Sequence, residues 1–387
     1  MEDYNKNFWN IWTTYAVFYF GKVNLSLIIP LLLATQGFTK YHVGWVASGF
    51  FFAYAVGQFL HGQISERFNP YKYIAVGLIG SAVMNTFLGF YGMFFWLLFF
   101  GEVFDGFFQS MGWSSCVRAV SEKSSNPSRA TTILGTSYQV GNSVAWLVAS
   151  FMIGWFGWQW GFWVAAIIMV LKAVILLVYA PKDYVLKKQS VKKQVKLTFT
   201  PHIILAGLGL CFLNMIRYGV ITWIPTFLYE TQQLSISSIG LKIFMIPVFG
   251  VLGTLLYNKL KTNRENTTIA YMIGLGLVFL AFPYATGNWI TILLLGSGFF
   301  VYGVHVYLVS TTPSMFVKEK VVAASTGFID GMGYIGTTII GILVPFILDG
   351  YSWKYVFYFW AGLALLIVIL TIVIKIKNYG IKHKNKY

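Results

Sequence analysis

Two basic residues, Lys22 and Arg217, interrupt stretches of sequence that are otherwise apolar. Lys22 opens KVNLSLIIP (22–30), and Arg217 lies within NMIRYGVITWIP (214–225). A charged side chain at the centre of a membrane-spanning helix costs about 2.5–3.5 kcal/mol on insertion scales, so a partner has to offset it. A planar guanidinium matches phosphate or carboxylate oxygens, and an ammonium adds a compact point charge. The two residues therefore predict a site for a small anion, with a structural ion pair as the alternative.

Acidic partners for these cations are scarce. The apolar stretches hold four basic and three acidic residues: Lys22, Lys172, Arg217 and Lys242 against Glu102, Asp105 and Asp330. This positive surplus favours a bound anion. Asp330 is expected to pair with Lys22 in the empty protein, to relay a proton, or to form a salt bridge unrelated to the site. Glu102 and Asp105 share one helical face, where they either couple protons or are structural partners of Lys172 or of loop cations.

Tyrosines lie where they would line the same cavity. Tyr15 and Tyr19 precede Lys22 by seven and three residues, on its own helical face. Four more lie in other apolar stretches: Tyr54, Tyr138, Tyr302 and Tyr334. A tyrosine hydroxyl can hydrogen-bond a polar ligand while its ring packs, and packing alone is the alternative for each of them. His305 is expected to have a packing role.

The elements that must position these residues are membrane helices. The chain of 387 residues is 57% hydrophobic and 10% charged, whereas soluble domains carry about 25% charged residues. A spanning helix needs about 20 mostly apolar residues. The sequence therefore predicts an all-α membrane protein with twelve helices: 8–33, 43–65, 73–91, 93–118, 131–155, 158–180, 202–230, 238–258, 267–286, 289–315, 323–347 and 352–375.

The distribution of Lys and Arg predicts the orientation. The connections on the side of the N-terminus carry twenty-two of these residues, and the opposite connections carry two, Lys40 and Lys354. By the positive-inside rule, both termini are predicted to be cytoplasmic, in a multi-pass protein of the plasma (inner cell) membrane. A basic linker, 181–201, separates two predicted six-helix bundles, 1–180 and 202–387.

Composition also excludes several classes of protein. The net charge of +16 falls in short stretches between hydrophobic runs, so the predicted partner is the lipid bilayer rather than a nucleic acid. Two cysteines and five histidines form no nucleophile–base or metal-ligand pattern. No GxxxxGK[ST] string occurs, so ATP drive is not expected. We predict no enzyme, no catalytic residue, no cofactor and no metal site.

The two halves repeat each other. Lys22 and Arg217 each stand eight residues before a proline. Further matches follow in the same order: Gly44 and Gly57 with Gly240 and Gly253, Gly135 with Gly327, and Trp160 with Trp353. Two related six-helix halves around a mid-membrane site describe a transporter whose halves rock against each other. The repeat places Lys22 and Arg217 at equivalent positions facing that site.

Longer strings carry a resemblance to a known family. GQISERF (62–68) resembles the loop between helices two and three of the major facilitator superfamily. FFQSMGWSSCVRAV, IRYGVITWIPTFLYE and FFVYGVHVYLVSTTP, in the predicted spans four, seven and ten, resemble the organophosphate:phosphate antiporters of that superfamily. The resemblance covers all twelve helices. It implies the major facilitator fold and the exchange of glycerol-3-phosphate or hexose-6-phosphate for inorganic phosphate.

The resemblance also implies site residues. Family members grip phosphate with one arginine in helix one and one in helix seven; Arg217 matches the second, and Lys22 replaces the first. A family lysine in helix two falls at Gln58, and a family histidine in helix five falls at Tyr138. A family charge pair falls at Val23 and Thr222, and the cavity tyrosines are matched by Tyr15, Tyr19, Tyr54 and Tyr334.

Together these observations predict a secondary transporter that works as a monomer. It would exchange a small phosphorylated organic anion for phosphate, with Lys22, Arg217, Asp330 and the tyrosines, Tyr138 included, at the site. The alternative is a proton-coupled symporter of an organic acid or another non-phosphate anion, which would use Asp330 or the Glu102–Asp105 pair. A third alternative, from a different class of protein, is a membrane receptor for a sugar phosphate.

Overall fold

The computed structural model describes residues 2–181, 201–260, 263–312 and 322–384. Over these residues the chain is helical and has no strand. The first half consists of α1 (Glu2–Thr35), α2 (Lys40–Ile64), α3 (Pro70–Tyr91), α4 (Phe95–Gln109), α5 (Gly112–Ser121), α6 (Pro127–Phe156) and α7 (Gln159–Val178). The second half consists of α9 (Pro201–Gln232), α10 (Ile236–Ile243), α11 (Met245–Lys259), α12 (Arg264–Ala281), α13 (Asn288–Val306), α15 (Val322–Gly350) and α16 (Trp353–Lys384).

These helices make the twelve predicted passes. Ten segments of the described chain are long and apolar enough to span a membrane, and α6 and the α4–α5 pair complete the set. Two passes are interrupted: a turn at Ser110 and Met111 separates α4 from α5, and Phe244 separates α10 from α11. The tenth pass ends in a π-helical turn, η3 (Tyr307–Thr311). The predicted linker lies almost wholly outside the described residues.

Local sequence signals set several helix starts. Asn69 caps α3 by accepting from the backbone amides of Tyr71 and Lys72, and Asn126 caps α6 in the same way. Proline occupies the first position of both helices, where its missing amide leaves no hydrogen bond unmade. These caps begin α3 and α6 three or four residues before the predicted spans, because a polar cap lies ahead of the apolar run that hydropathy detects.

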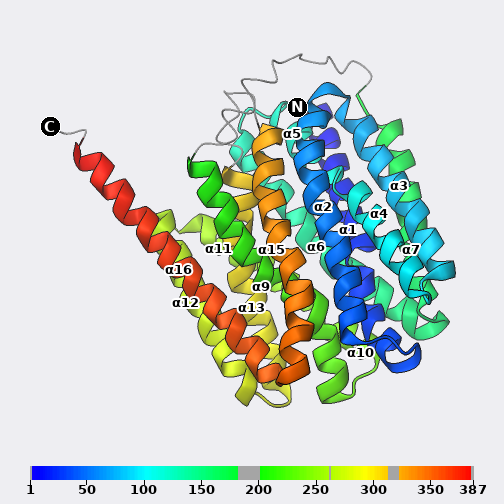
Figure 1. The fold of residues 1–387 in the computed structure, drawn as a ribbon. Helices are drawn as coiled ribbons and strands as arrows, with labels where there is room; N and C mark the ends of the chain where they lie inside the picture. The colour runs from blue at the N-terminus through cyan, green and yellow to red at the C-terminus, as the bar shows by residue number, and fades with distance from the viewer. Residues whose placement is uncertain (1, 182–200, 261–262, 313–321, 385–387) are drawn as a thin grey trace.

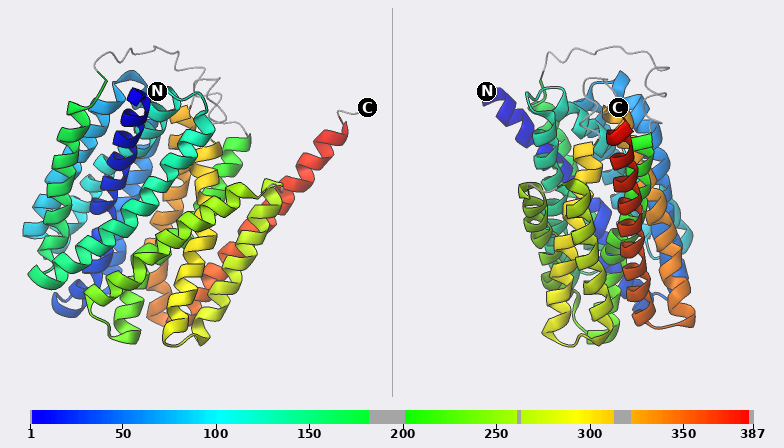
Figure 2. Two further views of the ribbon diagram at one scale, coloured as in Figure 1. Left: turned by 180° about the vertical axis from the view of Figure 1, so that it is seen from behind. Right: turned by 90° about the vertical axis from the view of Figure 1, so that its left-hand side faces the viewer.

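The passes stand side by side, and α1 begins at the same end of the bundle at which α16 ends (Figure 1). In the views of Figure 2, α16 continues past the neighbouring helices at that end. Large apolar side chains are exposed around the outside, including Trp96, Trp155 and Phe346. In a bilayer these side chains would meet lipid, so their exposure is consistent with membrane insertion.

The halves meet closely where glycine allows it. A Cβ on Gly44 of α2 would lie 2.6 Å from the carbonyl oxygen of Gly341 in α15, and a Cβ on Gly327 would lie 2.6 Å from that of Gln58 in α2. Small residues permit such close helix approach in membranes. Because Gly44 and Gln58 lie toward opposite ends of α2, the two halves touch on both sides of the centre.

Candidate functional site

Lys22 and Arg217 both lie at the centre of the interface between the halves. α1 carries Lys22 and α9 carries Arg217, with side chains only 6% and 3% exposed. Both helices run on through a proline, Pro30 in α1 and Pro225 in α9, although proline donates no backbone hydrogen bond. At this interface the structure brings together the two cations that the repeat placed at equivalent positions.

Lys22 is held by tyrosines rather than by a carboxylate. Its Nζ donates a hydrogen bond to the hydroxyl of Tyr334 at 3.1 Å. The same Nζ lies 3.8 Å from the ring centroid of Tyr54, 5.1 Å from that of Tyr19 and 5.3 Å from that of Tyr334. The negative faces of aromatic rings attract a cation, and more strongly in a desolvated site. Three rings from three helices therefore stabilise this buried charge.

Arg217 is surrounded in a similar way. One terminal nitrogen, Nη2, donates to the hydroxyl of Tyr19 at 3.1 Å, and Nη1 lies 3.4 Å from Nε2 of His305. The guanidinium carbon also lies near three ring centroids, at 4.6 Å from Tyr218, 4.9 Å from Tyr138 and 5.1 Å from Tyr302. The remaining guanidinium nitrogen, Nε, is buried and has no hydrogen-bond partner among the described residues.

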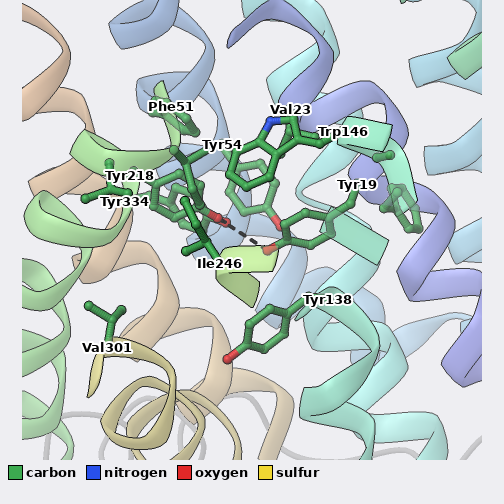
Figure 3. Close-up of a cluster of buried hydrophobic side chains, with 14 of the residues drawn as sticks. Tyr19, Val23, Phe51, Tyr54, Tyr138, Trp146, Tyr218, Ile246, Val301 and Tyr334 are labelled. Atoms are coloured by element: carbon green, nitrogen blue, oxygen red, sulfur yellow. Dashed lines mark hydrogen bonds between the residues drawn. The ribbon is translucent and has the colours of Figure 1, made fainter. Parts of the chain in front are cut away.

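Tyrosine hydroxyls join the two cations into one chain. Tyr19 lies 3.5 Å from Tyr218, and Tyr218 is hydrogen-bonded to Tyr334; Figure 3 shows these three hydroxyls converging. Lys22 therefore connects to Arg217 through Tyr334, Tyr218 and Tyr19. Each cation bonds directly to a tyrosine of the opposite half, Lys22 to Tyr334 of α15 and Arg217 to Tyr19 of α1.

The remaining predicted tyrosines lie around this chain. Tyr138 hydrogen-bonds through its hydroxyl to Nδ1 of His305 at 2.7 Å. Tyr15 packs on the rings of Tyr19, at 6.0 Å between centroids, and Trp113, at 4.6 Å. Within the described part of the chain, the aromatic and hydrogen-bond contacts of the two cations are made by other residues. Tyr15 thus borders the site without touching its charges, whereas Tyr138 belongs to the surroundings of Arg217.

Asp330 lies close enough to act electrostatically on both cations, but among the described residues it forms no ion pair with them. Its side chain is 4% exposed. Among the described residues, the ion pairs lie elsewhere, at Lys40–Glu230 and around Arg118. The direct Lys22–Asp330 pair considered from the sequence is therefore absent in this conformation, in which Nζ of Lys22 donates to Tyr334.

Glu102 and Asp105 face different surroundings. Asp105 accepts hydrogen bonds from Ser81 and, at 2.9 Å, from Asn85 of α3. Glu102 is 2% exposed, and its Oε1 has no hydrogen-bond partner among the described residues. Glu102 and Lys22 line the same cavity of about 20 Å³, room for about one water molecule.

Lys172 has a partner that the sequence did not indicate. Its Nζ donates to Oδ1 of Asn10 at 2.9 Å and to the hydroxyl of Thr13 at 2.8 Å, both on α1. The proposed pairing of Lys172 with Glu102 or Asp105 is therefore wrong. Two neutral oxygens hold this lysine inside the first half, away from the cation chain.

Sequence reasoning missed two residues of the site. Tyr218 follows Arg217 directly and forms the middle of the hydroxyl chain. His305, expected to have a packing role, contacts both Arg217 and Tyr138. A signal for His305 was its spacing of three residues from Tyr302, which places both on one face of a helix. The amide of Gln58, aligned with a family lysine, is buried and unpartnered among the described residues.

A twelve-pass helical bundle with a buried polar site between its halves is the architecture of secondary transporters. The family model described as "Major Facilitator Superfamily" matches residues 11–336. The chain therefore belongs to the major facilitator superfamily, and the predicted fold class is confirmed. This superfamily consists of transporters rather than enzymes.

Individual relatives agree with the predicted subgroup. The chain is 26% identical over 388 residues to the glycerol-3-phosphate transporter of Bacillus subtilis (strain 168), covering 90% of this chain and 86% of that protein. It is 22% identical over 392 residues, with the same coverage of both, to a probable hexose phosphate transport protein of Chlamydia pneumoniae. The predicted resemblance to organophosphate transporters is thus confirmed.

A solved structure matches the fold at a lower level of sequence similarity. The human organic anion transporter MFSD10 superposes with a TM-score of 0.74 at 14% identity, over 93% of this chain and 98% of that one. At this identity the likeness concerns the arrangement of helices alone. The nature of the bound anion has to be argued from the side chains of this chain.

Proposed function

We propose that the protein exchanges a small phosphorylated organic anion for inorganic phosphate across the plasma membrane. Lys22 and Arg217 would bind the phosphoryl group between the halves, 1–180 and 202–387, which would rock to expose the site to either side. The termini would face the cytoplasm, and one chain would hold a complete pathway. Relatives that transport glycerol-3-phosphate and hexose phosphate support this class of substrate.

One observation carries the proposal. Two buried cations, one from each half, lie at the interface without a carboxylate at ion-pair distance among the described residues. Tyrosine hydroxyls and rings hold them, and a hydroxyl hydrogen bond is weaker than a charge-assisted bond to an oxyanion. A phosphoryl group could displace the hydroxyls of Tyr334 and Tyr19 and take up both cations, as well as the unpartnered Nε of Arg217.

The surrounding side chains favour a compact, strongly charged ligand. The hydroxyl of Tyr218 lies in the middle of the chain that joins the cations, so it can donate to a phosphoryl oxygen without large movement. Lys22 supplies a point charge rather than the planar fork of an arginine, so it holds the anion with less directional preference. The organic part of the substrate would then extend toward groups such as the Gln58 amide.

Exchange in proteoliposomes tests the proposal. Vesicles loaded with phosphate would be offered labelled phosphate outside, with the wild type, Arg217→Lys and Lys22→Arg. We expect saturable exchange in the wild type, loss of exchange in Arg217→Lys, and retained exchange in Lys22→Arg. Lys242→Ala is a matched control, because Lys242 lies near the end of α10 and donates to Thr291 rather than to a residue of the cation site. Its loss should leave exchange intact.

The competing function is proton-coupled uptake of an organic acid. Glu102 supports it, because its buried Oε1 has no hydrogen-bond partner among the described residues, and a buried carboxyl with an unmet oxygen is more stable when it carries a proton. This function predicts uptake driven by an inward pH gradient alone, with no phosphate inside the vesicles. Absence of phosphate exchange in the wild type together with such uptake would replace the exchange proposal.

A further inference from the structure

His305 lies against the cation that would receive the anion. Its ring is 3% exposed. Nε2 faces Nη1 of Arg217 at 3.4 Å, and Nδ1 faces the hydroxyl of Tyr138 at 2.7 Å. Tyr138 and His305 come from opposite halves, on α6 and α13. The imidazole is therefore placed between the guanidinium and the interface at which the halves meet.

The partners of the ring determine its protonation state in this conformation. An arginine side chain only donates hydrogen bonds, so Nε2 of His305 has to accept from Arg217 and carries no proton. Nδ1 then carries the single ring proton and donates it to the hydroxyl of Tyr138. A neutral imidazole, not an imidazolium, thus stands beside the guanidinium in this conformation.

Charged and titratable groups surround the ring. Its burial opposes an imidazolium first, and the cations Arg217 of α9 and Lys22 of α1 oppose it further; α6 contributes Tyr138. From α11 and α12, Tyr257 and Tyr271 pack at Gly303, two residues away. No described carboxylate makes an ion pair with the ring. Like charges nearby disfavour an imidazolium, and a bound dianion would reverse the sign of this field.

We propose that His305 is a proton-linked, specificity-determining residue of the anion site. When a dianion binds between Lys22 and Arg217, a proton from bulk water adds to Nε2, and the new N–H donates to an oxygen of the anion. No other covalent bond changes, and the hydrogen bond that Nε2 accepts from Arg217 is lost. The residue would favour phosphoryl dianions over monoanionic carboxylates, since the second negative charge stabilises the imidazolium. The inference rests on the proposed function, because it requires an anion at this site.

Calorimetry of phosphate binding to the purified protein tests this inference. Titrations in two buffers with different heats of ionisation give the number of protons taken up per anion bound. A mildly alkaline pH keeps free phosphate almost entirely dianionic. We expect the wild type to take up about one proton per phosphate, as linkage requires for a group that is protonated only in the complex. His305→Gln should bind several-fold more weakly and take up almost none.

His61→Gln is the matched control. His61 is also buried, but it bonds to Tyr73 of α3, away from both cations, so its removal should leave proton uptake unchanged. If His305→Gln binds phosphate with the same proton uptake as the wild type, the proton goes to the anion or to another residue and the inference is overturned. Wild-type binding without uptake would overturn the inference alone, whereas no binding would overturn phosphate transport as well.

A second variant covers the case in which His305→Gln does not fold. Tyr138→Phe keeps the imidazole but removes the acceptor for its Nδ1 proton. An imidazolium loses more from this change than a neutral ring does, because hydrogen bonds from charged donors are stronger. The pH at which proton uptake per phosphate reaches half of its maximum should therefore be lower than in the wild type. An unchanged profile in the folded variant would overturn the role of His305.

Discussion

Replacing Tyr334 with phenylalanine should tighten anion binding rather than weaken it. The hydroxyl of Tyr334 accepts a hydrogen bond from Nζ of Lys22 at 3.1 Å in the conformation described here. If an anion takes over this lysine, the bond is broken on binding. Removing the hydroxyl destabilises the empty site and leaves the occupied site almost unchanged, so the difference appears as affinity.

The magnitude can be bounded from the contacts. A hydrogen bond to a charged group contributes about 1.5–3 kcal/mol, and about 1.4 kcal/mol corresponds to a tenfold change in affinity. Two features reduce the effect in the variant. The ring of Tyr54 still lies 3.8 Å from Nζ, and the adjacent cavity of about 20 Å³ can admit a water molecule. We therefore expect phosphate to bind roughly three- to tenfold more tightly.

Competition binding of labelled phosphate to purified protein measures this change. Tyr257→Phe is the matched control: Tyr257 is a buried tyrosine of α11 whose hydroxyl bonds to Thr268, away from the cations. Its loss should lower stability and leave affinity unchanged. A several-fold weaker affinity in folded Tyr334→Phe would refute the reasoning, because it would mean that this hydroxyl bonds the anion instead of standing in for it.

Two further predictions concern packing and the conformational equilibrium. Gly106→Ala should lower the free energy of unfolding by about 1–3 kcal/mol, since the new Cβ would lie 2.2 Å from the carbonyl oxygen of Phe50. Thermal melts measure this loss. Gly362→Ala is the control: its new Cβ would have no neighbouring atom within 4 Å, so the change should be neutral or stabilising. Lys40→Ala breaks the 2.9 Å ion pair with Glu230 of the other half. The fraction of molecules that are open at the end of the bundle where Lys40 lies should rise by up to about fivefold, which corresponds to the free energy of a surface ion pair. Spin-label distances across that end would measure the change, and an unchanged distribution would show that the pair does not hold the halves together.

The helical passes were predictable because bilayer thickness fixes the length of an apolar run. The interruptions at Ser110 and Phe244 were not. A turn of one or two residues within a pass does not change the mean hydropathy enough to be detected. The start of α6 at Pro127 was missed for a related reason, because its asparagine cap and polar first turn lie outside the apolar run.

The sequence predicted the two cations of the site. It did not predict which side chains contact them. Lys22 and Arg217 stand out because a cation in an apolar run is costly wherever the helix packs. Their contacts with Tyr334 and Tyr19 depend on how α1, α9 and α15 meet, over separations of about two or three hundred residues. His305 was assigned to packing for the same reason: its proximity to Arg217 follows from the placement of α13 against α9, which no local pattern encodes.

The crossed arrangement of tyrosines limits how the two halves of such a protein can evolve separately. Lys22 relies on a tyrosine encoded in the second half of the chain, and Arg217 relies on one encoded in the first. A chimera that joins the first half of this chain to the second half of a relative keeps Lys22 and Tyr19 but takes the partner of Lys22 from the relative. Lys22 then loses its hydrogen bond unless the relative has tyrosine at the position matching Tyr334. The duplicated units can therefore diverge in their lipid-facing surfaces independently, while positions 22 and 334, and positions 19 and 217, have to change together.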